Sequence, residues 1–168
     1  MKSDKVINIR IAGLGGMGVL TAAGILAETA FCAGYDIKRS ELHGMSQRGG
    51  SVSSDIRFGK TVFSPMIPGV ETDYLIVMAE DQVNVFRHDL RPGGEIISCV
   101  LFNPAELPHK KSLNIALLGA LSVKLDFPRE TWLDVLKKTF NEELAVINIS
   151  AFELGGKLMK QAMTGKHP

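Results

Sequence analysis

The feature that most constrains this chain is a glycine-rich turn between an apolar strand and an apolar helix. Residues 6–12 are rich in β-branched side chains and predict a buried strand, whereas residues 19–33 are rich in Ala, Leu and Ile and predict a buried helix. Between them, Gly13, Gly15 and Gly18 fit the spacing G-x-G-x-x-G. Glycine permits a tight turn and lets phosphates approach the backbone, where N–H groups at a helix N-terminus attract anions. The motif alone is weak, because a plain strand-to-helix turn has the same pattern.

Composition sets the broad class of the chain. With 168 residues it is long enough for one domain with a single core, and a net charge of +1 gives no reason to expect nucleic acid as a partner. Cys32 and Cys99 both lie in apolar runs, so we expect two free, buried thiols, with a disulfide as the open alternative. Neither belongs to a C-x-x-C motif, so no zinc or iron–sulfur site is predicted. The N-terminus lacks a signal-peptide pattern and no apolar run is long enough to span a membrane, which predicts a cytoplasmic protein.

Hydrophobic periodicity predicts an α/β fold along the whole chain. We expect a Rossmann-like, three-layer α/β/α domain with a mixed, mostly parallel sheet. It covers residues 1–163, and a frayed tail follows at 164–168. The predicted strands lie near residues 5–12, 35–38, 51–58, 61–64, 73–79 and 95–101. Gly59 and Lys60 predict a hairpin turn, and Pro92, Gly93 and Gly94 predict a turn before the last strand. Helices are expected over 81–88 and 113–125, from Pro128, and after Asn141.

The first strand, helix and second strand together predict a βαβ unit, which raises the question of a nicotinamide cofactor. In that fold an acidic residue about 20 positions after the glycines binds the ribose hydroxyls. Asp36 and Glu41 are the candidates, but Lys38 and Arg39 occupy the expected end of the strand. Basic residues there suit a phosphate on the ribose, and a solvated strand end is the simpler alternative.

The most unusual stretch is residues 39–51, which is polar, rich in glycine and without helical or strand periodicity. A loop of this kind is typical of a functional segment. His43 is a candidate acid–base group or, more commonly, a structural hydrogen-bonding residue. Arg48, followed by Gly49 and Gly50, suits bidentate binding of an anion or carboxylate, with a solvated or interface arginine as the alternative.

Read in order, these motifs resemble the γ subunit or γ domain of 2-oxoacid:ferredoxin oxidoreductases, a family that includes the β subunit of indolepyruvate oxidoreductase. The most specific run is Glu-x-His-Gly-Met-Ser-Gln-Arg-Gly-Gly at residues 41–50. It is accompanied by the glycine loop at 13–18, by Ser-Pro-Met-Ile-Pro at 64–68, and by Asn114 and Asn148 at the start of two further motifs. Together they cover nearly the full chain, with a fold that resembles domain III of pyruvate:ferredoxin oxidoreductase.

The resemblance implies a CoA-dependent oxidative decarboxylation of a 2-oxoacid to an acyl-CoA, with ferredoxin as the electron acceptor. Thiamine diphosphate and iron–sulfur clusters are then expected on partner subunits, namely thiamine-binding α and β subunits and a ferredoxin-type δ subunit or domain. This chain would be an accessory subunit without catalytic residues or metal ligands of its own, contacting its partners and presenting coenzyme A. The candidate CoA-binding residues are Gly13, Gly15, Gly16, Met17, Gly18, Lys38, Arg39, His43, Gln47 and Arg48.

Two departures from the family pattern stand out. The family loop usually reads Gly-x-Gly-Gly-Gln-Gly, whereas Met17 replaces the glutamine here, and residues 100–113 look shorter than usual. Two other functions remain open from the sequence: a stand-alone NAD(P)-binding dehydrogenase, for which the chain lacks the length of a substrate domain, and a scaffold whose glycine loop binds nothing. The sequence leaves open whether pyruvate, 2-oxoglutarate, a branched-chain oxoacid or indolepyruvate is the substrate.

Overall fold

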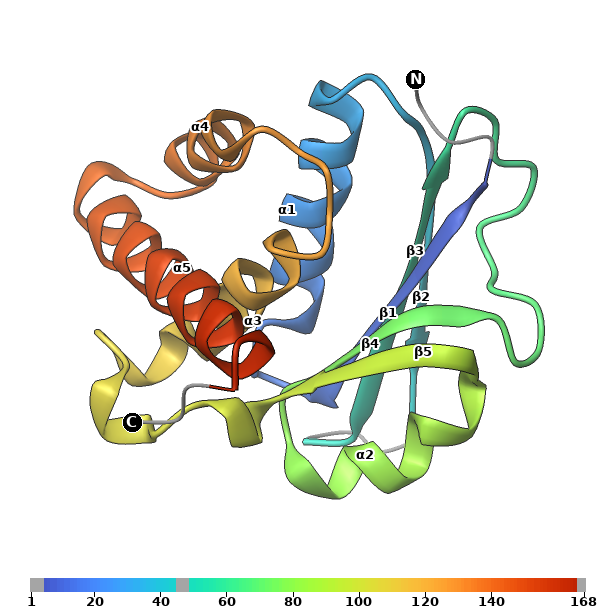
Figure 1. The fold of residues 1–168 in the computed structure, drawn as a ribbon, viewed down its shortest axis with the longest axis horizontal. Coiled ribbons are helices and arrows are strands. Elements are labelled where there is room, and N and C mark those ends of the chain that lie inside the picture. Colours follow the sequence, from blue (N-terminus) through green and yellow to red (C-terminus); the bar gives the residue numbers. More distant parts are fainter. Residues whose placement is uncertain (1–4, 45–48, 166–168) are drawn as a thin grey trace.

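The computed structural model describes residues 5–44 and 49–165 (Figure 1). The strands are β1 (Ile7–Leu14), β2 (Asp36–His43), β3 (Ser51–Gly59), β4 (Thr72–Val77) and β5 (Leu90–Ser98). The α-helices are α1 (Val19–Cys32), α2 (Glu80–Phe86), α3 (Leu113–Ser122), α4 (Arg129–Thr139) and α5 (Glu142–Met163). Short 3₁₀ helices are η1 (Arg87–Asp89), η2 (Cys99–Leu101), η3 (Pro104–Glu106) and η4 (Lys110–Ser112).

The strands form one mixed sheet in the order β2-β3-β1-β4-β5. β1 pairs in parallel with β4, and β4 with β5, whereas β3 runs antiparallel to both β1 and β2. Four of the five strands therefore point the same way, in agreement with the predicted mixed α/β fold. Since β3 lies between β1 and β2, the predicted βαβ unit is split by an antiparallel strand.

One face of the sheet is apolar; α1 and α3 pack against it, and α4 and α5 cover these two helices (Figure 1). Ile9 and Ile11 of β1 point to this side and are completely buried. Trp132 of α4 joins the same core and packs on Phe152 of α5 with ring centroids 5.4 Å apart. α3 and α5 lie so close that a Cβ on Gly155 would be 1.8 Å from the carbonyl oxygen of Ala116. Glycine is thus what lets these two helix backbones meet.

The opposite face is charged and is covered by α2, η1 and the segment between β3 and β4. Arg10 of β1 donates to both carboxylate oxygens of Asp55 at 2.6 and 2.9 Å, and it also bonds Asp89 of η1. The hydrogen bond to Asp55 is the main cause that raises the pKa of Arg10. Among the α-helices of the described residues, only α2 lies on this face and the other four lie on the apolar side, so the second layer is thin.

A second ion cluster on the charged face surrounds Asp73 at the start of β4. Lys5 donates to its carboxylate at 2.8 Å, Arg91 at 2.5 Å, and the Asn8 N–H at 2.9 Å. Burial acts to raise the pKa of Asp73, but these three donors outweigh it and hold the pKa below its usual range. The two clusters satisfy charges that would be costly to bury alone.

Several predicted boundaries were wrong. Residues 61–64 form no strand, so the hairpin at Gly59 and Lys60 does not exist; the chain instead leaves the sheet because the Val62 N–H bonds to the Asp36 carboxylate at 2.7 Å. Residues 39–43, predicted as loop, continue β2 because they pair with β3 along their length. Pro92 to Gly94 lie inside β5 rather than in a turn, and residues 99–101 are 3₁₀ rather than strand.

The structure also tests the predictions for the two cysteines and for the C-terminal end of α1. Cys32 and Cys99 are both free, but Cys32 is exposed and Cys99 is only half-buried, which corrects the prediction of two buried thiols. It is the last residue of α1 and lies on the helix's solvent side. Gly34 has a φ of 81°, which confirms that the chain turns there in the left-handed conformation that glycine favours.

Candidate functional site

The glycine turn joins the carboxyl end of β1 to the N-terminus of α1. Gly16 and Gly18 have φ values of 90° and 81°, the left-handed region in which a side chain is strained. The Gly15 N–H donates to the Gly50 carbonyl oxygen at 2.9 Å, and the Met17 N–H donates to that of Leu14 at 3.1 Å. The Gly15 and Met17 amides are therefore used within the protein and are not available to a ligand.

The free amides lie one step further along, in the first turn of α1. The first hydrogen bond of the helix runs from the Ala22 N–H to the Gly18 carbonyl oxygen at 3.0 Å. In the described part of the chain, the N–H groups of residues 19–21 have no backbone acceptor. The turn also carries no acidic side chain that would neutralise the positive end of the helix dipole. These amides are consequently available to an anion.

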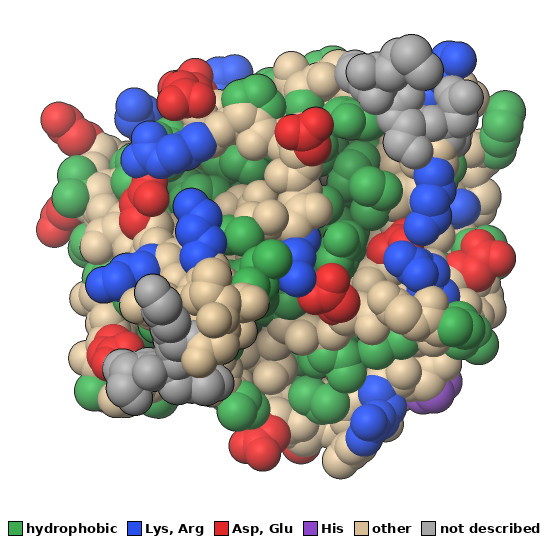
Figure 2. All heavy atoms as spheres, viewed as in Figure 1, with side chains coloured by type: hydrophobic (Ala, Val, Ile, Leu, Met, Phe, Trp, Pro, Cys, Tyr) green, Lys and Arg blue, Asp and Glu red, His purple; other side chains and the backbone are tan. Residues whose placement is uncertain are grey.

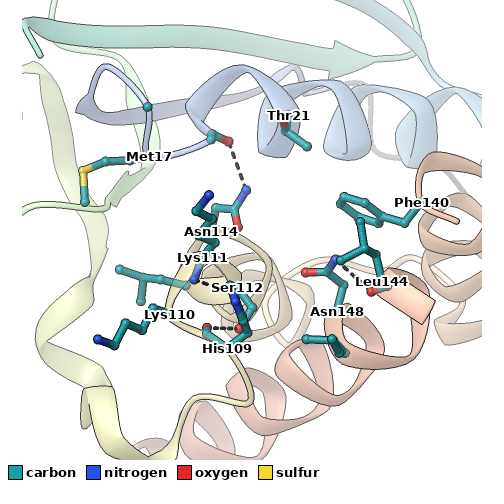
Figure 3. Close-up of a pocket in the computed structure, with 14 residues that line it drawn as sticks. Met17, Thr21, His109, Lys110, Lys111, Ser112, Asn114, Phe140, Leu144 and Asn148 are labelled. Carbon is teal, nitrogen blue, oxygen red and sulfur yellow. Dashed lines mark hydrogen bonds between the residues drawn. The ribbon is translucent and has the colours of Figure 1, made fainter. Parts of the chain in front are cut away.

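A cavity of about 460 Å³ opens beside this turn (Figure 3). One wall is the glycine turn, a second is η4 with the start of α3, and a third is α5 with Phe140 at the end of α4. The lining residues are Gly16, Met17, Gly18, Thr21, His109, Lys110, Lys111, Ser112, Leu113, Asn114, Phe140, Leu144, Ile147 and Asn148. The N-termini of α1 and α3 thus open into the same space.

Asn114 holds these two helix N-termini together. Its side-chain amide donates to the Gly18 carbonyl oxygen at 3.2 Å, and its side-chain oxygen accepts from the Ile115 N–H at 3.0 Å (Figure 3). A Cβ on Gly18 would come within 2.4 Å of the Asn114 amide nitrogen. Gly18 is therefore required both for its positive φ and for this contact, which explains the last glycine of the motif better than contact with a ligand does.

The mouth of the cavity is basic, and the sequence analysis missed the residues that make it so. Lys110 and Lys111 of η4 are exposed, and neither has an ion-pair partner among the residues that the structure describes. The Nδ1 atom of His109 accepts from the Lys111 N–H at 3.1 Å, which fixes the turn that presents both lysines. The run His-Lys-Lys at 109–111 was the available signal, but nothing in the sequence placed it beside residues 16–21.

The cavity floor holds buried polar side chains. Ser112 donates to the His109 carbonyl oxygen at 2.6 Å, and the Asn148 amide donates to the Leu144 carbonyl oxygen at 2.9 Å. Both residues are more than nine-tenths buried. Phe140 and Ile147 add apolar surface on the α5 side. The site therefore combines amide and lysine donors for an anion with an apolar wall for the rest of a ligand.

The structure does not bring Lys38 and Arg39 to the glycine turn. Lys38 pairs with Arg57 in the sheet register. It stands five residues before His43, the end of β2, and is therefore roughly 16 Å from that end of the strand. Lys38 lies 3.2 Å from the Asp36 carboxylate, and Arg39 lies 3.1 Å from that of Glu41. Their prediction as phosphate ligands beside the glycines finds no support in this position.

His43, by contrast, ends β2 near the other side of the turn. It lines a second cavity of about 400 Å³ together with Gly15, Gly16, Leu20 and Thr21. Its Nε2 atom lies 3.9 Å from the Glu41 carboxylate, and more than half of its side chain is exposed. Gln47 and Arg48 lie outside the described residues, so their predicted role remains a prediction.

Met17 takes part in the turn through its own sulfur. The Sδ atom accepts a hydrogen bond from the Leu14 N–H at 3.4 Å, so the side chain folds back on the end of β1. It still lines the larger cavity. A thioether is a weak acceptor and offers no donor, so Met17 would lack the polar contacts of the glutamine predicted for the family loop.

The family profile described as pyruvate ferredoxin/flavodoxin oxidoreductase matches residues 8–108, which is more than half of the chain. The chain belongs to this family. Indolepyruvate oxidoreductase subunit IorB of Thermococcus kodakarensis is 30% identical, with 95% of this chain and 98% of the relative covered. 2-Oxoglutarate synthase subunit KorC of Archaeoglobus fulgidus is 25% identical, with 95% and 91% covered.

Solved structures show the same fold. The γ subunit of keto/oxoacid ferredoxin oxidoreductase from Geobacter sulfurreducens superposes with a TM-score of 0.75 at 20% identity, covering 92% of this chain and 98% of that one. 2-Oxoglutarate:ferredoxin oxidoreductase from Magnetococcus marinus, with 2-oxoglutarate, coenzyme A and succinyl-CoA bound, gives 0.78 at 21% identity, covering 94% of this chain but 32% of that one. These matches confirm the resemblance and the α/β fold, and they agree with the predicted role of an accessory oxidoreductase subunit.

The alignment with IorB of Thermococcus kodakarensis extends over 199 positions, more than the 168 residues of this chain, so this chain lacks segments that its relative has. That agrees with a shortened chain, although the position of the shortening stays a prediction. In the described ranges no cluster of three or more His, Cys, Asp or Glu side chains could hold a metal ion. No helix there is both long and apolar enough to cross a membrane.

The order of the strands argues against the alternative function of a stand-alone NAD(P)-binding dehydrogenase. A dinucleotide fold needs the second strand beside the first, so that its acidic residue reaches the ribose of a ligand on the glycine turn. Here β3 intervenes, which sets β2 roughly 10 Å from β1. Asp36 is at the far end of β2 and accepts from the Val62 N–H, and Glu41 is paired with Arg39.

Proposed function

We propose that this chain is the γ-type subunit of a 2-oxoacid:ferredoxin oxidoreductase and that it binds coenzyme A in the cavity between α1, η4 and α5. The observation that carries the proposal is the convergence on one space of two helix N-termini and of two lysines that have no ion-pair partner among the described residues. A diphosphate is the ligand best matched to such a site, since helix N-termini and lysine ammonium groups both stabilise multiple negative charge.

The topology of the sheet supports this location. The connection from β1 passes through α1 on one face of the sheet, whereas the connection from β4 passes through α2 on the other face. In open α/β sheets, ligands bind at the carboxyl ends of the strands where the connections diverge in this way. The glycine turn lies at the end of β1, directly at that point.

The chemistry of coenzyme A fits the composition of the walls. Its diphosphate would face the amides of residues 19–21, Lys110 or Lys111 would meet a phosphate group, and the apolar wall of Phe140, Leu144 and Ile147 would take less polar parts of the molecule. The Magnetococcus marinus relative of the same fold was solved with coenzyme A bound, which supports CoA as the ligand class.

In the assembled enzyme, coenzyme A would accept the acyl group left when a 2-oxoacid loses carbon dioxide, while the two electrons released pass to ferredoxin. Thiamine diphosphate supplies the carbanion chemistry and iron–sulfur clusters carry electrons, both on companion α, β and δ-type subunits. This chain's own residues would hold and orient the CoA phosphates. The names of the relatives as oxidoreductase subunits support that division of roles.

Calorimetric titration with coenzyme A tests the site. We expect the double variant Lys110→Gln/Lys111→Gln to bind at least tenfold more weakly than the unaltered chain, with a smaller dependence on salt. The matched control is Lys137→Gln/Lys138→Gln, a second lysine pair that is exposed at the end of α4. Equal affinity of both double variants, or no CoA binding by the chain alone and in the assembled complex, would refute the proposal.

A further inference from the structure

The segment between β3 and β4, residues 60–71, carries exposed apolar side chains that nothing in the fold uses. Phe63 is 93% exposed, Met66 57% and Val70 56%, so this short segment holds three of the exposed large hydrophobic residues of the described chain. It projects from the charged face of the sheet, on the side opposite α4 and α5 (Figure 1). Figure 2 shows hydrophobic side chains along this margin of the molecule, among lysine and arginine side chains.

The sheet holds this segment in a fixed conformation. Arg57 of β3 donates to the carbonyl oxygens of Ser64 and Met66 at 2.9 and 3.0 Å. The Ile67 N–H donates to Asp55 at 3.2 Å. Val62 is bonded through its N–H to Asp36, so three charged side chains of the sheet secure the segment along its length.

The segment has one buried side and one exposed side. Val62 and Ile67 turn inward and are 3% and 7% exposed, whereas Phe63 and Met66 between them turn outward. Pro65 and Pro68 further restrict the backbone. An apolar surface that is exposed yet already ordered loses little conformational entropy when it binds, which is the property of a docking surface rather than of a loose loop.

The comparisons favour a companion subunit as the partner of this surface. The matched part makes up 32% of the Magnetococcus marinus chain and 38% of ketoisovalerate oxidoreductase subunit VorA of Methanothermobacter marburgensis. In those proteins an equivalent domain is covalently continuous with further parts of the enzyme. IorB of Thermococcus kodakarensis is matched over 98% of its length, so in that protein the domain stands alone. A separate domain must replace the covalent link by a surface with enough affinity of its own.

Resting on the proposed γ-subunit function, we propose that Phe63, Met66 and Val70 dock this chain onto a companion subunit of the oxidoreductase, inserting the Phe63 ring into an apolar pocket of that subunit. Aromatic side chains of this kind dominate the affinity of interfaces. The cavity between α1, η4 and α5 is on the opposite face of the sheet, so docking here leaves it open to coenzyme A.

The test is co-purification of the tagged full chain with its co-expressed thiamine-binding subunits, followed by measurement of the dissociation constant of the complex. We expect Phe63→Ser to weaken association at least tenfold while CoA affinity of the isolated chain is unchanged. Phe31→Ser is the matched control, because Phe31 is also an exposed phenylalanine, 64% exposed on α1, and this variant should assemble normally.

The outcomes separate the two proposals. If the unaltered chain assembles and Phe63→Ser assembles equally well, the docking surface is refuted and the γ-subunit function stands. If the isolated chain forms a dimer that Phe63→Ser abolishes, the surface binds a second copy and the proposal is wrong. If the unaltered chain does not assemble with thiamine-binding subunits at all, the proposed function fails and the docking proposal with it.

Discussion

The two faces of the central sheet differ in what holds them. The face toward α1, α3 and α5 is apolar, with Ile9 and Ile11 fully buried, and its stability comes from close packing. The other face holds Arg10, Asp55 and Asp73 in ion clusters that also secure the segment at residues 60–71. Successive residues of β1 thus serve the core and the charged face in turn. Apolar packing holds the helices that form the cavity, whereas charged side chains hold the proposed docking segment at residues 60–71.

The largest effect is expected from crowding the packed face. Gly155→Ala would place a Cβ 1.8 Å from the Ala116 carbonyl oxygen, so α3 and α5 would have to move apart. We expect the free energy of unfolding to fall by about 3 kcal/mol, the upper end for overpacking. Urea denaturation followed by circular dichroism measures this change.

The neighbouring residue provides the control. A Cβ on Gly156 would lie 3.5 Å from the Gly119 carbonyl oxygen, an ordinary contact. Gly156→Ala should therefore raise the free energy of unfolding by about 0.5–1 kcal/mol, the gain of alanine over glycine in a helix. Similar values for the two variants would show that α3 and α5 are not packed as tightly as described.

Asp55→Asn removes a charge from the ion cluster on the other face of the sheet. Asp55 is 1% exposed, bonds Arg10 through both oxygens and accepts from the Ile67 N–H. Asparagine keeps the shape but loses the charge, while Asp89 still pairs with Arg10. We expect a loss of about 2 kcal/mol in unfolding free energy, with faster amide exchange at Ile67. A loss without any change at Ile67 would mean that the carboxylate does not hold the segment.

These two faces also explain what the sequence could predict. Apolar strands and helices were predicted well, because β-branched side chains mark the first strand, and Trp132, Val135 and Leu136 repeat at helical spacing in α4. The region at residues 59–64 was mispredicted as a hairpin, since the alternation and the Gly59-Lys60 pair are local signals. The hydrogen bond from Val62 to Asp36 that overrides them joins residues 26 positions apart.

The sequence predicted only part of the candidate site, because the rest depends on contacts between residues far apart in the chain. The glycine turn was found because its three elements are contiguous in the sequence. Lys110 and Lys111 were missed, because only the tertiary contact of Asn114 with Gly18, 96 positions away, brings η4 to the turn. The prediction for Lys38 and Arg39 assumed that β2 ends at residue 38, whereas pairing with β3 extends it to His43.

Acidification should weaken the charged face first. The folded pKa of Asp73 lies below its ordinary value of 3.8, so the unfolded carboxyl takes up its proton at the higher pH. Its stabilising contribution is complete well above pH 3.8 and is lost as the pH falls through the folded pKa. Thermal melts between pH 5 and pH 2, at roughly half-unit steps, should show a shallower loss for Asp73→Asn than for the unaltered chain. Parallel curves would exclude this contribution.

The smallest effect is expected at the half-buried Asp36. The Val62 N–H is the main cause that lowers its pKa, followed by Lys38. Asp36→Asn should leave the melting temperature nearly unchanged, because the carboxylate is partly solvated and its ion pair with Lys38 is screened by water, and should speed amide exchange at Val62 alone. Unchanged exchange at Val62 would show that Asp36 does not secure the start of the segment at residues 60–71.

The most direct test of the central claim is a ¹⁵N–¹H NMR titration of the chain with coenzyme A. Binding between the two helix N-termini predicts the largest shifts at the amides of residues 16–21 and 110–114, with those of residues 60–71 unmoved. Shifts that instead cluster around Trp132, Lys157 and Lys160, where a separate cavity of about 580 Å³ lies, would contradict it. So would saturating coenzyme A that moves no amide of the glycine turn.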